Sequence, residues 1–177
     1  MEKFNSVTNP KVIENLKLQI SNSRIIDWAT DFNKDAGISY KRLSYILDYW
    51  KNKFSWEKSE RELNSFNQFY FIDKGLKTHF LHLKSPEDNA LPLLLIHGWP
   101  GSIFEFFDLI PLLTNPNENN LLGNQPFDLV IPSLPNVGFS FSKNQKPMDL
   151  VEISDHFVKL MNCLGYKNYF IQGGDLG

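Results

Sequence analysis

Three short apolar runs in the second half of the chain constrain its fold more than any other feature. LPLLLI, at residues 91–96, is apolar throughout, as is typical of a strand buried on both faces of a parallel sheet. FDLVIPSLP at 127–135 and NYFIQ at 168–172 are two further β-prone runs. Helical patterns separate the three runs. This alternation of strand and helix predicts an α/β fold with a mostly parallel sheet.

The segments between these runs read as two helices and a polar loop. The first helix is expected to carry Phe104, Phe107, Ile110 and Leu113 on one face. The loop TNPNENNLLGNQP, at 114–126, is polar and expected to be exposed. The second helix has strong boundary signals, which are Asp149 as N-cap, Glu152 three residues later and Gly165 at the C-terminal end.

The first part of the chain follows a different pattern. Asn9-Pro10 is a helix start, a second helix is expected with Leu43, Ile46, Leu47 and Trp50 on one face, and a third is expected to begin after Ser55. QFYFIDKGLKTHFLHL, at 68–83, predicts a β-hairpin. We therefore predict a helical N-terminal domain with a hairpin at 1–85, and the first half of an α/β domain at 86–177.

Composition excludes several classes of protein. The net charge is −2 and no basic stripe is present, so no nucleic-acid partner is expected. The single cysteine, Cys163, excludes an internal disulfide and is consistent with a reducing compartment. The longest apolar run is only strand-sized and the first residues are polar, so the sequence predicts no integral membrane segment and no signal peptide. A cytoplasmic location follows, with peripheral association with the endoplasmic reticulum left open.

Two loops follow apolar strands and are candidates for an active site. HGWPGS, at 97–102, follows the first apolar strand, and GGDLG, at 173–177, follows the last. In an open α/β sheet both loops would lie at the carboxyl ends of the strands, where ligand-binding and active sites are found. A small-x-nucleophile-x-small turn lifts its central residue above the sheet. The sequence therefore predicts Asp175 as a nucleophile.

The residues around Asp175 fit that prediction. The backbone N–H groups of Leu176 and Trp99 would form an oxyanion hole. Gly173 and Gly177 are expected because side chains there would collide in so tight a turn. Alone, either motif is weak evidence, since such residues are common in ordinary turns. The evidence is much stronger when both occur in this order, each directly after an apolar strand.

The chain resembles the microsomal-type epoxide hydrolases of the α/β-hydrolase superfamily, including their N-terminal domain, from about Tyr40 to its end. The resemblance is carried by YILDYW, FSWEKSERELNSFNQF, GLKTHFLHLKSP, LPLLLIHGWPGSIFEF, PSLPNVGFS and LGYKNYFIQGGDLG. The family usually has glycine and an aromatic residue where Asn136 and Val137 stand, and tryptophan where Leu176 stands. Leucine at position 176 keeps the backbone N–H that would be the oxyanion donor, but it removes an aromatic side chain from the wall of the site.

The resemblance implies a two-step mechanism without a cofactor or metal. Asp175 would open an epoxide to form an alkyl ester, and a histidine oriented by an acidic residue would then activate water to release a vicinal diol. His97, Gly98, Pro100 and Gly174 would be structural residues of the site. The lid tyrosines, the acid and the base histidine would lie beyond Gly177, so residues 1–177 are read as an N-terminal portion. The partners are then an epoxide and water.

Other functions compete with this interpretation. A serine hydrolase would need G-x-S-x-G, and Gly138-Phe139-Ser140 lacks the closing glycine. Haloalkane dehalogenases also use an aspartate in this turn, but they typically have tryptophan where Leu176 stands. A catalytically inactive fragment or interaction protein is the alternative from another class. The kind of epoxide, whether xenobiotic, lipid or hormone, stays open.

Overall fold

The computed structural model describes residues 1–26, 37–119 and 124–177, which form two compact units. One unit is Ser6–Leu63, and the other joins Met1–Asn5 to Asn64–Gly177. The elements in chain order are β1 (Glu2–Phe4), α1 (Pro10–Asn22), α2 (Tyr40–Asn52), α3 (Trp56–Asn64), β2 (Gln68–Asp73), β3 (Leu76–Leu83), β4 (Leu91–Ile96), the 3₁₀ helix η1 (Ile103–Phe106), α4 (Leu109–Thr114), β5 (Phe127–Pro132), the 3₁₀ helix η2 (Gly138–Ser140), α5 (Leu150–Cys163) and β6 (Phe170–Gly173).

Polar caps begin the helices of the Ser6–Leu63 unit, as the sequence predicts. The Asn9 side chain accepts the Lys11 N–H at 3.0 Å, and Pro10 takes the first helical position of α1. Within this unit, Glu60 of α3 accepts hydrogen bonds from Ser6 at 2.8 Å and from the Thr8 hydroxyl at 2.6 Å. These bonds lower the pKa of Glu60, and the bond from the Thr8 side chain lowers it most. They also hold the residues that precede α1 against α3.

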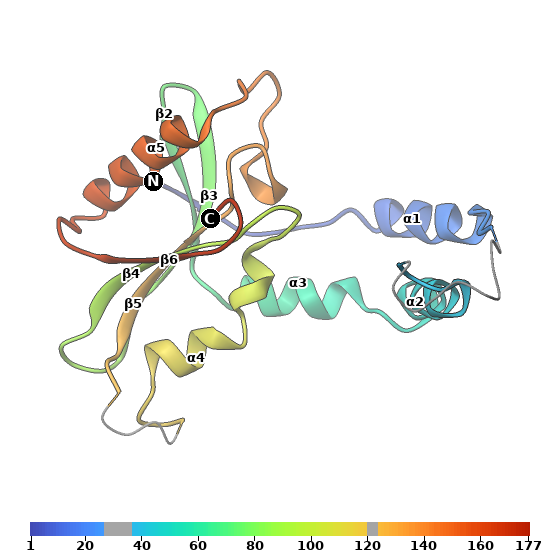
Figure 1. The fold of residues 1–177 in the computed structure, drawn as a ribbon, viewed down its shortest axis with the longest axis horizontal. Helices are drawn as coiled ribbons and strands as arrows, with labels where there is room; N and C mark the ends of the chain where they lie inside the picture. The colour runs from blue at the N-terminus through green and yellow to red at the C-terminus, as the bar shows by residue number, and fades with distance from the viewer. Residues whose placement is uncertain (27–36, 120–123) are drawn as a thin grey trace. The chain divides into compact units, whose positions relative to one another are not determined.

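The second unit is built on a six-stranded sheet of order β1-β2-β3-β5-β4-β6. Strands β5, β4 and β6 are parallel, as predicted, while β1, β2 and β3 join them by antiparallel pairing (Figure 1). The expected hairpin is present as β2 and β3, and both of its strands belong to this sheet. Because the hairpin is continuous with the sheet, the compact units divide near residue 63; the domain boundary at residue 85 stays a prediction.

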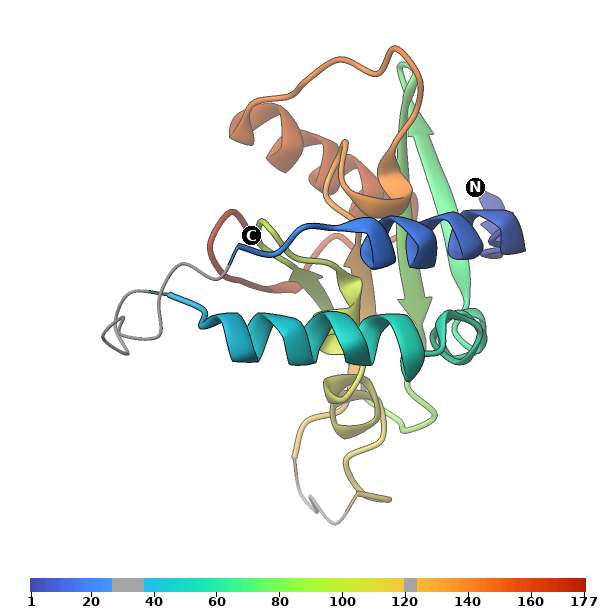
Figure 2. The ribbon, with the colours of Figure 1, turned by 90° about the vertical axis from the view of Figure 1, so that its right-hand side faces the viewer.

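The core lies on both faces of this sheet. On one face α5 packs Phe157, Leu160 and Met161 against Leu94 and Val130. Neighbouring strand residues such as Leu95 and Leu129 are also buried, and because side chains alternate along a strand they point to the other face. Figures 1 and 2 show α4 on that side of the sheet, opposite α5. The parallel strands are therefore apolar on both faces, as their sequences predict.

The prediction of one helix through Phe104 and Leu113 is wrong. The segment forms the short η1 and then α4, with a break at Phe107 and Asp108. Pro111 supplies the physical reason, because it has no N–H to bond the carbonyl of Phe107 in a continuous helix. In the first turn of α4 that missing donor costs nothing. In the loop at 114–126, residues 120–123 lie outside the described residues. The expectation of exposure is confirmed at Asn117, Glu118, Asn124 and Gln125 and is wrong at Thr114 and Pro116, which are buried.

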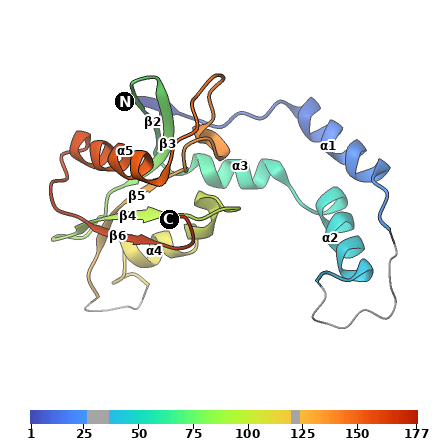
Figure 3. The ribbon, with the colours of Figure 1, turned by 45° about the horizontal axis from the view of Figure 1, so that its top comes forward.

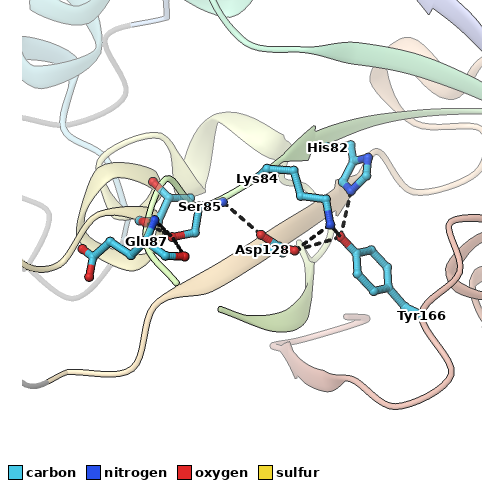
Figure 4. Close-up of polar contacts among 7 residues, drawn as sticks. His82, Lys84, Ser85, Glu87, Asp128 and Tyr166 are labelled. Atoms are coloured by element: carbon cyan, nitrogen blue, oxygen red, sulfur yellow. Dashed lines mark hydrogen bonds and ion pairs between the residues drawn. The ribbon is translucent and has the colours of Figure 1, made fainter. Parts of the chain in front are cut away.

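A polar network joins the carboxyl end of β3 and the amino end of β5 to the loop before β6 (Figure 4). Asp128 accepts Lys84 Nζ at 2.7 Å, the Ser85 N–H at 2.9 Å and the Tyr166 hydroxyl at 3.2 Å. The Tyr166 hydroxyl also lies 3.0 Å from His82 Nε2. Burial raises the pKa of Asp128, but the bonds from Lys84 and Ser85 outweigh burial and the pKa is lowered. Both oxygens of this carboxylate therefore accept hydrogen bonds from protein donors.

Candidate active site

The two loops singled out in the sequence leave neighbouring strands on the same side. β6 pairs in parallel with β4, and Gly173 is opposite Ile96 in the register. HGWPGS and GDLG therefore begin side by side at the carboxyl ends of the parallel strands (Figure 3). This pairing brings Trp99 to Asp175, although 76 positions separate them in the sequence.

Asp175 stands at the top of a tight turn. Its φ is +58°, in the left-handed region that a residue with a side chain adopts only at a cost. The Gly177 N–H donates to the Gly174 carbonyl at 2.9 Å and closes the turn. A Cβ on Gly177 would lie 2.3 Å from the Ile96 carbonyl oxygen, and one on Gly173 would lie 2.2 Å from the Gly177 carbonyl carbon. Both glycines are thus required by close approach.

Backbone N–H groups hold the Asp175 carboxylate. The Trp99 N–H donates to Asp175 Oδ1 at 2.7 Å. That bond, and after it the Leu176 N–H, lowers the pKa of Asp175, while desolvation opposes them. The carboxylate is therefore ionised at neutral pH and faces the two donors proposed for the oxyanion hole. It is solvent-exposed in this chain.

His97 fixes the start of the neighbouring loop. Its side chain is only 1% exposed, and its Nε2 accepts the Leu134 N–H at 3.1 Å. Because Nε2 accepts, the proton lies on Nδ1, which is 2.8 Å from the Gly98 carbonyl oxygen and donates to it. A Cβ on Gly98 would lie 2.7 Å from the Asp175 Cβ. The loop therefore passes as close as a backbone allows to the turn Gly173–Gly177, which we call the elbow. The adjoining Trp99–Pro100 peptide is cis.

A cavity of about 440 Å³ opens over the elbow. Asp175, Trp99 and Pro100 line it, as the motifs predict, together with Glu105, Phe106 and Gln172, which sequence reasoning missed. A signal for Glu105 was present in the sequence, because Ser102-x-x-Glu105 has the spacing of a capping box. On the other side of the elbow an apolar hollow of about 320 Å³ is lined by residues including Ile153, Phe157 and Leu176.

Each of the chain's four histidines has hydrogen-bond partners of its own, among the described residues, other than Asp175. His97 bonds the loop after β5, and His156 Nε2 lies 2.9 Å from the Thr78 hydroxyl. His79 lies between Ser133 and Gln68, at 3.0 Å from each. His82 contacts Tyr166. The geometry thus brings the aspartate and its amides together and places no described histidine as the partner of that aspartate.

The described helices also bear on membrane association. Within residues 1–26, 37–119 and 124–177, no helix combines the length and apolar character needed to cross a bilayer.

Comparisons with known proteins identify a family for each part of the chain. The family described as "Epoxide hydrolase N terminus" matches residues 1–106, and the "alpha/beta hydrolase fold" family matches residues 92–177. Epoxide hydrolase 1 of Oryctolagus cuniculus is 37% identical over 98% of this chain and 39% of its own length. The chain therefore spans about two fifths of the length of the curated relatives it matches.

Solved structures agree with this relationship. An epoxide hydrolase of Aspergillus niger has a TM-score of 0.84 and 34% identity, covering 99% of this chain and 46% of its own. The juvenile hormone epoxide hydrolase of Bombyx mori has a TM-score of 0.86 and 31% identity, covering 99% of this chain and 42% of its own. The α/β fold predicted from the alternation of strand and helix, and the α/β-hydrolase fold that the resemblance implies, are thus confirmed.

Proposed function

Since the chain belongs to the epoxide hydrolase N-terminal family and continues into an α/β-hydrolase fold, we propose that the protein opens an epoxide to a vicinal diol, with Asp175 as nucleophile. The observation that carries the proposal is the Asp175 carboxylate itself. It is raised on a strained turn, is ionised, receives the Trp99 N–H and faces a cavity. Ionisation and access to the cavity are what a nucleophile needs, and the Trp99 N–H is placed to stabilise the oxyanion of the second step.

In the first step a carboxylate oxygen of Asp175 attacks one carbon of the epoxide. A carbon–oxygen bond forms to Asp175 as the ring carbon–oxygen bond breaks, and the ring oxygen takes up a proton to become a hydroxyl. Trp99 donates to Oδ1, so we assign the attack to Oδ2. Oδ1 then becomes the carbonyl oxygen of the ester, already directed at an N–H group. Resemblance to the family assigns the proton donors to lid tyrosines outside residues 1–177.

In the second step water attacks the ester carbonyl carbon of Asp175. Negative charge develops on Oδ1 in the tetrahedral intermediate, where the Trp99 and Leu176 N–H groups stabilise it. Collapse breaks the bond to the alkyl oxygen, which takes up the proton that the base removed from water, and the diol leaves. The acid proton left on Asp175 returns to the proton donor of the first step, which restores the carboxylate. The family's base is a histidine with an acidic partner. His79, His82, His97 and His156 all have other partners, so we assign that base to the part of the protein outside residues 1–177.

Intact-mass analysis tests the nucleophile directly. The whole protein is mixed at high concentration with an aryl epoxide, the reaction is quenched at short times, and the mass of the intact protein is measured. We expect an adduct of one epoxide mass that maps to Asp175, diol in the supernatant, and neither product with Asp175→Ala. Residues 1–177 alone, if circular dichroism shows them folded, should keep the adduct, because no base releases it. Diol formation by the Asp175→Ala protein at the normal rate would exclude Asp175 as the nucleophile, and the absence of diol from the unsubstituted whole protein would exclude the function.

A further inference from the structure

The loop from Gly98 to Ser102 is held at both of its ends. At one end a Cβ on Gly98 would lie 2.7 Å from the Asp175 Cβ and 2.8 Å from its Oδ1. At the other end a Cβ on Gly101 would lie 2.0 Å from Glu105 Oε1 and 2.8 Å from the Gly98 carbonyl oxygen. The loop is therefore packed between the elbow on one side and the Glu105 carboxylate on the other. The Trp99 N–H lies between these two contacts.

Glu105 is bonded to the last residue of this loop in both directions. Its Oε1 accepts the Ser102 N–H at 3.0 Å, and its own N–H donates to the Ser102 carbonyl at 3.1 Å. The side chain is exposed and lines the same cavity as Asp175. Nothing in the proposed reaction uses this carboxylate. Among the described residues, its one side-chain hydrogen bond goes to the loop that carries the proposed oxyanion donor.

Resting on the proposed function, we infer that Glu105 is a positioning residue, whose carboxylate holds the Gly98–Ser102 loop so that the Trp99 N–H stays directed at Asp175 Oδ1. Without the bond to Ser102, the loop gains room at Gly101 and the Trp99 N–H is free to turn away from the elbow. Glu105 acts through Trp99 and does not touch the reacting atoms.

The two chemical steps should respond differently to a misplaced donor. Alkylation removes charge from Asp175, so a donor that stabilises negative charge does not assist this step. Hydrolysis of the ester places negative charge on Oδ1, and the Trp99 N–H is then needed most. Removal of a whole oxyanion donor costs about 100- to 1000-fold in rate, so a donor that is displaced and not removed should cost on the order of 10-fold.

Three substitutions separate the position of the carboxylate from its charge. Glu105→Gln keeps an oxygen at the Ser102 N–H and loses the charge. Glu105→Asp keeps the charge but draws the oxygens back by one methylene group. Glu105→Met keeps the length and has no oxygen. In single-turnover experiments on the whole protein with an aryl epoxide, intact mass follows the rise and the decay of the Asp175 ester.

We expect ester decay to slow about 10-fold in Glu105→Asp and Glu105→Met, with ester formation within about threefold of the unsubstituted protein. In Glu105→Gln the ester should decay at a rate within about threefold of that in the unsubstituted protein, because glutamine keeps an oxygen that can accept the Ser102 N–H. If Glu105→Met does not fold, the Gln and Asp variants decide by themselves. Equal slowing of both steps, or normal decay in Glu105→Asp, would overturn the inference.

The same experiment distinguishes this inference from the proposed function. If the unsubstituted protein forms no ester on Asp175, the proposed function fails and the role of Glu105 fails with it. If the unsubstituted protein forms and releases the ester while Glu105→Asp does so at the same rate, only the role of Glu105 fails.

Discussion

Asp175 and Asp128 lie at opposite ends of the parallel strands, and different groups hold their carboxylates. Asp128 pairs in register with Pro92 at the amino end of β4, whereas Asp175 follows Gly173, which is opposite Ile96 at the carboxyl end. Asp128 receives the Lys84 ammonium, the Ser85 N–H and the Tyr166 hydroxyl. Asp175 receives backbone N–H groups and faces a cavity.

Both carboxylates have a lowered pKa, so the direction of the pKa shift does not distinguish the proposed nucleophile from the other carboxylate. What differs is whether the donors can remain in place while the carboxylate changes. An ester on Asp128 would lose its ion pair with Lys84 and displace Tyr166. An ester on Asp175 keeps a carbonyl oxygen that still accepts from Trp99. A carboxylate held by backbone donors can therefore keep those donors when it is esterified, as the proposed reaction of Asp175 requires.

The largest effect is expected from a Cβ inside the elbow. Gly177→Ala would place a Cβ 2.3 Å from the Ile96 carbonyl oxygen, so the turn that raises Asp175 must shift. A shift of about 1 Å at a reacting group costs about 100-fold, so we expect ester formation in the whole protein to fall by at least that much. Intact mass after a single turnover measures it.

Gly174→Ala is the matched control for this prediction. It adds the same methyl group to the same turn, but nothing lies within 4 Å of the added Cβ. Ester formation should stay within about twofold. Equal losses in the two variants would show that the elbow tolerates no substitution and that the clash with Ile96 is not the cause.

Protonation of His79 is expected to lower the stability of the protein in acid, and this limits the pH range over which the two carboxylates can be compared. The pKa of His79 is lowered to about 3 because burial disfavours the imidazolium, whereas in the unfolded chain it is about 6.5. Below pH 6.5 the unfolded state therefore binds a proton that the folded state does not. Stability should fall by about 1.4 kcal/mol per pH unit, or about 2 kcal/mol at pH 5, before either aspartate is protonated.

Urea unfolding at several pH values between 7.5 and 4.5 checks this expectation, with His79→Gln as the comparison. The variant loses bonds to Ser133 and Gln68 and should be less stable at pH 7.5, but its stability should change less with pH. The slope that remains in His79→Gln includes His82 and His156, because burial lowers the pKa of each. Parallel pH curves for the two proteins would contradict the prediction.

The elbow could be predicted from the sequence because its constraints are local. Asp175, its glycines and the strand before it lie within eight residues, and HGWPGS similarly follows its own strand. The polar network at the other end could not. Lys84 and Tyr166 are 82 positions apart, and only the pairing of β3 with β5 and of β4 with β6 brings them together. The split between η1 and α4 was missed because apolar spacing outweighed Pro111.

The smallest effect is expected at the amino end of the strands, and it tests whether the two ends are independent. Asp128→Asn removes the charge opposite Lys84, which is 61% exposed at its side chain, so solvent screens much of the loss. We expect the free energy of unfolding to fall by about 1 kcal/mol, with ester formation on Asp175 within about twofold.

Lys84→Met, alone and combined with Asp128→Asn, completes a double-mutant cycle that isolates the pair. If the network only stabilises the sheet, all three variants should form the Asp175 ester at the normal rate while their unfolding midpoints fall. A loss of alkylation that follows the loss of stability would mean that β6 transmits strain from Tyr166 to the elbow. The structural carboxylate would then also be a determinant of the reactive one.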